Sequence, residues 1–112
     1  MPTTKPLVRY AEIFVGGGPY DLASGFRASK LAERLAEATK WNWQLNHVYT
    51  CQRLERLEES GVFTKLANDT VDVVFVYGEH EPSVAEGRIF YLDIRQTLDD
   101  DLAFVQQGLN NG

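Results

Sequence analysis

The sequence predicts a single small α/β (or α+β) domain, a four-stranded mixed sheet with helices packed on it. The chain has 112 residues, 44% hydrophobic and 24% charged, which is average for a globular protein with one core. The spacing of apolar residues along the chain indicates strands and helices in the order βαβαββα. Helical connections between the first three strands permit parallel or mixed pairing with helices on both faces. We expect a disordered tail at 1–6, the domain at 7–109 and a frayed end at 110–112.

The first two elements are a strand and a helix. Residues 7–15, LVRYAEIFV, are rich in β-branched and aromatic types, and glycines end the run. Residues 26–40 carry apolar side chains at helical spacing, with charges on the opposite face. This pattern predicts an amphipathic helix.

Residues 41–51, WNWQLNHVYTC, show the strictest alternation in the chain and predict a strand. One face would carry Trp41, Trp43, Leu45, His47, Tyr49 and Cys51, and the other Asn42, Gln44, Asn46, Val48 and Thr50. Residues 52–60 follow as a short helix that ends at Gly61, and residues 62–69 stay ambiguous, with a further helical turn as one interpretation.

The second half predicts two strands and a helix. Residues 70–77 have valine on both faces, as expected of a strand covered on both sides. Residues 88–94 are expected to be their hairpin partner across the loop GEHEPSVAEG. Thr97 and Asp100 have capping-box spacing, the acidic run 99–101 suits a helix N-terminus, and a buried stripe follows at Leu102, Val105 and Leu109.

The order of these elements resembles that of thioredoxin-like domains. The resemblance concerns topology alone, because the Cys pair expected after the first strand is absent and no proline precedes the third strand. It therefore implies an architecture and no activity. A split βαβ or another two-layer α+β arrangement stays open.

Charge and composition narrow the classes of partner. Eleven Lys and Arg against sixteen Asp and Glu give a net charge of −5, the wrong sign for direct nucleic-acid binding. The same charge would attract a basic protein, although it also suits plain solubility. No window has the length of apolar sequence that a membrane span needs, and the N-terminus lacks the apolar core of a secretory signal. With Cys51 as the single cysteine, a reducing, cytoplasmic location is expected.

The glycines Gly16, Gly17 and Gly18 raise the question of a phosphate-binding loop. A Walker loop needs Gly-Lys followed by Ser or Thr, whereas Gly25 is followed by Phe26 and Arg27. A dinucleotide fingerprint that starts at Gly16 places Asp21 where its third glycine belongs. We interpret the loop as a structural turn. The alternative is an anion held by backbone amides at the helix start, with Tyr20 as a contact residue.

Two further groups could carry chemistry. Glu79, His80 and Glu81, with Glu86 nearby, could bind a metal or share a proton, but neighbours along a loop are badly placed to converge, so a solvated acidic loop is favoured. His47 and Cys51 are four apart on one strand, too far for a nucleophile and its base. No catalytic set, metal or cofactor is expected.

Trp41 and Trp43 lie in the core if their strand is central. If that strand is an edge, they and the uncharged face Asn42, Gln44 and Asn46 become available to a partner, since no lysine guards it.

The sequence thus favours a small acidic protein that acts without catalysis, by binding another protein as an adaptor, inhibitor or regulatory factor. The partner would be a protein of basic character, and a homodimer stays open. The alternative is a small-molecule or anion-binding domain, or a small enzyme, with its site at the glycine-rich loop after the first strand and contributions from Tyr49 or His80.

Overall fold

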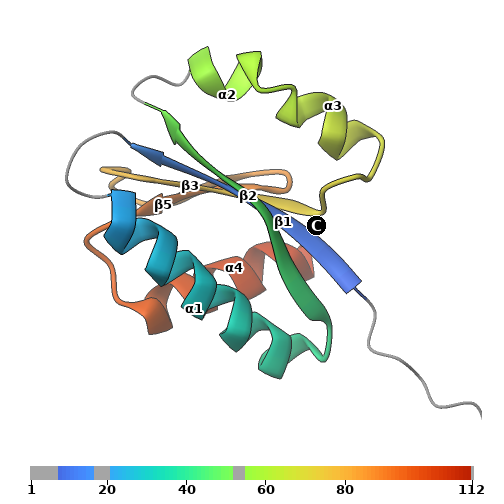
Figure 1. The fold of residues 1–112 in the computed structure, drawn as a ribbon. Helices are drawn as coiled ribbons and strands as arrows, with labels where there is room; N and C mark the ends of the chain where they lie inside the picture. The colour runs from blue at the N-terminus through green and yellow to red at the C-terminus, as the bar shows by residue number, and fades with distance from the viewer. Residues whose placement is uncertain (1–7, 17–20, 52–54, 112) are drawn as a thin grey trace, which may run out of the picture.

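The computed structural model describes residues 8–16, 21–51 and 55–111, without the side chains of 21–24, 47–51, 55, 56 and 111. Within these ranges, five strands form one mixed sheet and four helices cover it (Figure 1). In chain order the elements are β1 Val8–Gly16, α1 Asp21–Thr39, β2 Asn42–Cys51, α2 Glu55–Glu59, α3 Val62–Ala67, β3 Val73–Gly78, β4 Val84–Glu86, β5 Ile89–Asp93 and α4 Leu98–Asn111. The predicted small mixed α/β fold is confirmed.

The sheet has the strand order β2-β1-β3-β5-β4. Strands β2, β1, β3 and β5 run parallel to one another, and β4 is antiparallel to β5. The expected number of four strands is wrong, because β4 forms inside the predicted loop. All three of its residues are exposed, so it has no buried face to produce an alternating pattern.

The expected hairpin between 70–77 and 88–94 is also wrong. β5 pairs parallel to β3, from Val74 opposite Ile89 to Gly78 opposite Asp93. The chain first reverses into β4, which lies outside β5, and returns through a turn at Gly87 with φ of 59°. β3 consequently has a parallel neighbour on each side, and Val73 to Tyr77 are all buried, as the valine run predicted.

Helices cover both faces of the sheet. α1 and α4 lie on one face, and α2 and α3 on the other (Figure 1). The larger core cluster lies between the sheet and α1 with α4, and includes Ile13, Leu31, Phe75, Phe90 and Val105. The smaller cluster lies under α2 and α3, and includes Phe14, Leu57, Val62, Leu66 and Val74. The ambiguous segment 62–69 is therefore a helix over most of its length, docked through Val62 and Leu66.

α4 begins as its sequence indicates, with the Asp100 amide donating to Thr97 Oγ1 at 3.1 Å. The buried stripe is shifted, however. Val105 is fully buried, whereas Leu102 and Leu109 are half-buried. Asp101, the last residue of the acidic run 99–101, is 0% exposed. Asp101 lies four residues before Val105 on the inner helix face, and its charge is paired with Arg27.

β2 lies at the edge of the sheet, which the sequence left open. Its register with β1 shifts between Ala11 and Glu12, so Leu45 stands opposite Ala11 and His47 opposite Glu12. Asn46 is the extra residue of this bulge. The regular alternation predicted from Trp41 to Cys51 is therefore interrupted by a bulge at Asn46. In the described part of the chain, no helix is both long and apolar enough to cross a membrane.

Candidate functional site

The glycine-rich loop lies at the carboxyl end of β1. The strand ends at Gly16 and α1 begins at Asp21, so the helix starts before the predicted residue 26 and the connection from β1 is shorter than predicted. Gly17, Gly18 and Tyr20, together with the Asp21 side chain, lie outside the described residues. Whether an anion binds there stays a prediction.

A buried polar cluster lies near the same end of the sheet and was missed by sequence reasoning. Arg27 Nε donates to Asp101 Oδ2 at 2.9 Å, and its Nη atoms donate to the carbonyls of Ile94 and Gln96. Gln96 Nε2 donates to Asp101 Oδ1 at 2.8 Å, and the Tyr77 hydroxyl lies 3.4 Å from Asp101 Oδ2. The one feature of the sequence that could have indicated this cluster is Asp101, an aspartate on the same face of α4 as the buried Val105.

Burial dominates the electrostatics of this cluster. It raises the pKa of Asp101, although the Arg27 guanidinium opposes the shift. Burial and the Asp101 charge also raise the pKa of the Tyr77 hydroxyl far above its usual range. Both Asp101 oxygens accept hydrogen bonds, so the cluster ties α1 to α4 and offers no open nucleophile or base.

The acidic tract at 79–81 does not converge on one point. The His80 ring packs edge-on against Tyr91 at 5.5 Å between centroids, whereas Glu81 Oε2 pairs with Arg95 Nη2 at 2.9 Å. Glu79 is exposed. Burial lowers the pKa of His80 and nearby Asp93 partly offsets the shift. Within the described ranges, no group of three or more His, Cys, Asp or Glu residues could hold a metal ion.

A buried ion pair lies on the face of β1 that α2 and α3 cover, and the sequence analysis did not predict it. Glu12 is 2% exposed, and its Oε1 lies 2.8 Å from Lys65 Nζ of α3. Its Oε2 is buried and has no hydrogen-bond partner among the described residues. The sequence signal is a carboxylate in the centre of an apolar strand. For His47 and Cys51 the structure describes the backbone alone, which pairs with Glu12 and Gly16 of β1.

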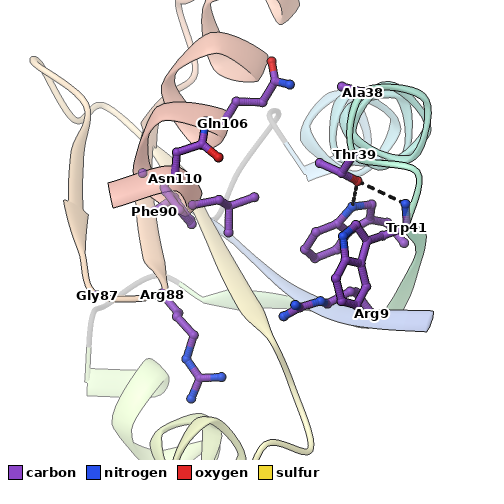
Figure 2. Close-up of a pocket in the computed structure, with 12 residues that line it drawn as sticks. Arg9, Ala38, Thr39, Trp41, Gly87, Arg88, Phe90, Gln106 and Asn110 are labelled. Carbon is purple, nitrogen blue, oxygen red and sulfur yellow. Dashed lines mark hydrogen bonds between the residues drawn. The ribbon is translucent and has the colours of Figure 1, made fainter. Parts of the chain in front are cut away.

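A groove of about 800 Å³ opens at the amino-terminal ends of the strands (Figure 2). It lies between the last turns of α1 and α4 and is lined by Arg9, Ala38, Thr39, Trp41, Trp43, Gly87, Arg88, Phe90, Gln106, Gly108, Leu109 and Asn110. Its volume is typical of small-molecule sites. Trp41 and Trp43, the two candidate binding residues, therefore lie in one wall of the groove. Trp43 is a buried core residue at 8% exposure, and Trp41 is half-buried.

Thr39 positions the two indoles. Its Oγ1 accepts hydrogen bonds from Trp43 Nε1 at 2.9 Å and from the Trp41 amide at 3.3 Å (Figure 2). The Arg9 guanidinium lies 3.7 Å from the centroid of the Trp41 ring, a cation–π contact. Arg9 Nη1 also donates to Asp72 Oδ1 at 3.1 Å. The end of α1, the start of β2 and the start of β1 are thus joined at the groove.

A second surface lies on the other face of the same strand ends. Val8 stands opposite Asn42 and Tyr10 opposite Gln44. Val8 is 41% exposed and Tyr10 is 37% exposed, and Asn42 and Gln44 are exposed as well. Glu12 and Phe14, further along the same face, contact the α2–α3 layer, so that layer covers only the carboxyl half of the face. We call Val8, Tyr10, Asn42 and Gln44 the open corner.

The described residues thus include the ion-paired buried carboxylates of Glu12 and Asp101, the groove and the open corner. Comparisons of the chain with family models, curated proteins and solved structures find no match. The ion-pair clusters hold elements together, whereas the groove and the open corner present surface to other molecules.

Proposed function

We propose that this chain is a non-catalytic protein-binding domain, an adaptor, inhibitor or regulatory factor, whose partner docks on the open corner and the adjoining edge of β2. The observation that carries the proposal is the uncovered sheet face at Val8 and Tyr10. Apolar strand residues normally lie beneath a second layer, and here the α2–α3 layer stops before it reaches them.

The composition of the open corner suits an interface. It combines a tyrosine and a valine with the two side-chain amides of Asn42 and Gln44, and it carries no charge. Interface centres are depleted in charged residues and enriched in tyrosine. A partner that covers the corner would bury apolar surface and could bond both amides.

The edge of β2 would add backbone hydrogen bonds to this contact. β1 is its strand neighbour on one side, and no described strand pairs with the other side. The bulge at Asn46 divides this edge into two regular stretches, of which Asn42–Leu45 adjoins the open corner. A bulge discourages indiscriminate strand pairing, so recognition would depend chiefly on the side chains of the open corner.

The charge of the chain favours a basic partner. A net charge of −5 attracts an oppositely charged protein and raises its association rate. Such a complex would weaken as salt is added, because exposed charges are screened.

The test is site-specific photocrosslinking in cells of the native host. A photoreactive residue at Gln44 should capture a defined protein, whereas one at Val84, exposed on the opposite edge of the sheet, should not. Tyr10→Lys should abolish the capture, because a lysine at the open corner places a charge in the apolar contact and repels a basic partner, while Val84→Lys should leave it unchanged. Capture of a second copy of the chain would make the partner a homodimer subunit. Equal capture from both positions, or none from Gln44, would refute the proposal.

The alternative function, ligand binding at the glycine-rich loop, has one supporting observation. β1 and β3 are adjacent, and the chain passes from β1 to β2 on one side and from β3 to β5 on the other. Open α/β sheets bind ligands at the carboxyl ends of such strands. A rise in melting temperature with inorganic phosphate or nucleotides, absent with chloride at matched ionic strength, would support this alternative.

A further inference from the structure

We infer that the groove at the amino-terminal ends of the strands binds a small aromatic carboxylic acid, with Arg9 as the carboxylate receptor. This site is separate from the open corner, because the groove lies on the α1–α4 face of the sheet and the corner on the α2–α3 face. It is also at the opposite end of the strands from the glycine-rich loop.

The ionisable groups of the lining are all cationic. Of its twelve residues, Arg9 and Arg88 are the only charged ones, although the chain as a whole has a net charge of −5. The Arg88 guanidinium donates to Asp69 Oδ1 at 3.1 Å and to the Leu66 carbonyl, neither of which lines the groove. Figure 2 shows it pointing away from the groove. Arg9 is therefore the cation that a ligand in the groove would meet.

Arg9 is held in place and keeps donors to offer. Trp41 covers its guanidinium at 3.7 Å and Asp72 accepts from Nη1. Asp72 Oδ2 is itself occupied by the Tyr10 amide at 2.8 Å. The guanidinium has five N–H donors, and the bond to Asp72 is its one hydrogen bond within the described residues. A planar, preorganised fork of this kind matches a carboxylate in bidentate geometry.

The rest of the lining favours an aromatic body. Trp41, Trp43 and Leu109 supply apolar surface, and Asn110 projects into the groove from α4 (Figure 2). Aromatic rings pair favourably with aromatic walls in offset or edge-on geometry. A flat ring that carries a carboxylate would contact these walls while its oxygens meet Arg9.

Tryptophan fluorescence reports on this site directly, because the chain has two tryptophans and both line the groove. The full chain is titrated with phenylacetate, with its neutral isostere phenylacetamide and with acetate, which lacks the ring. We expect phenylacetate to change the emission and to bind roughly tenfold more tightly than phenylacetamide, since charge-assisted bonds are about twice as strong as neutral ones. Acetate should bind more weakly than phenylacetate.

The variants assign the preference to Arg9. Arg9→Gln should bring phenylacetate and phenylacetamide to similar affinities, whereas Arg34→Gln, at an exposed arginine outside the groove, should retain the preference. If Arg9→Gln does not fold, Arg9→Lys replaces it, and the preference should fall severalfold because an ammonium cannot form the planar fork.

Three results would overturn the inference. These are equal binding of acid and amide by the unmodified chain, no change in emission with any of the three probes, or an undiminished preference in a folded Arg9 variant. None of them bears on photocrosslinking from Gln44, so this inference and the proposed function can fail separately.

Discussion

Gly108 allows α4 to lie directly against the buried ring of Phe90, and replacing it tests that packing. A Cβ at Gly108 would lie 2.4 Å from Phe90 Cε1 and 3.0 Å from Cζ. Carbon atoms pack at about 3.5 to 4.0 Å, so α4 or the ring must move by about 1 Å. Phe90 is fully buried, and its ring centroid lies 6.2 Å from those of Phe75 and Phe104.

The expected result of Gly108→Ala is a loss of about 1 to 2 kcal/mol in the free energy of unfolding. Alanine gains up to about 1 kcal/mol over glycine in a helix, but overpacking a buried site costs about 1 to 3 kcal/mol. The matched control is Gly25→Ala in α1, where an added Cβ meets nothing within 4 Å. That variant should be as stable as the parent or more stable by up to about 1 kcal/mol.

Urea unfolding followed by tryptophan fluorescence measures both variants, with unchanged m-values as the sign of a simple stability change. A second test combines Gly108→Ala with Phe90→Leu, which removes the clash. The double variant should be more stable than the sum of the two single losses predicts. If Gly108→Ala matches or exceeds the stability of the parent, the close approach of α4 to Phe90 is wrong.

Two further predictions concern the titratable groups. Arg27→Met should cost about 3 to 5 kcal/mol because it leaves the Asp101 charge buried and unpaired, whereas Asp101→Asn should cost less, since Arg27 keeps its two carbonyl partners. Because the pKa of Asp101 is raised in the fold, the parent should lose stability relative to Asp101→Asn as pH rises from about 4 through that pKa. For His80, whose folded pKa is lowered, an NMR titration should give a midpoint below about 6.5, and its contribution to stability should be lost as pH falls through that midpoint.

The outcomes that would contradict these predictions are distinct. Equal losses of stability for Arg27→Met and Asp101→Asn would contradict the first prediction, because they would show that an unpaired Asp101 carboxylate costs no more than an unpaired Arg27 guanidinium. A His80 midpoint at or above 6.5 would show that the ring is solvated rather than packed against Tyr91. Urea unfolding over a series of pH values supplies the first measurement, and one-bond proton–carbon spectra of the imidazole supply the second.

Most of the regular elements could be predicted because their side chains repeat with the period of the backbone. The amphipathic pattern of 26–40 indicated α1, and the valines of 70–77 indicated a strand covered on both faces. β4 escaped prediction because an exposed three-residue strand is held by backbone bonds to β5 alone. The bulge at Asn46 escaped because an extra residue in one strand is defined only relative to its partner.

The candidate sites were predictable only in part. Trp41, Asn42, Trp43 and Gln44 were singled out from their alternation, but the groove behind the tryptophans needs Arg9, Phe90 and the end of α4, which are distant in sequence. The open corner likewise exists because the α2–α3 layer ends before Tyr10, and no local pattern encodes the extent of a layer.

The amino-acid sequence by itself determined most of the helices and strands, the net negative charge and the segments with an apolar face, since these depend on residues close together along the chain. Only the tertiary structure decided that β2 is an edge, that β5 runs parallel to β3, that Asp101 and Glu12 are buried with cationic partners, and that Arg9 lies beneath Trp41. Each of these depends on contacts between segments far apart in the sequence, whose free energies are set by burial and charge pairing that no local stretch contains.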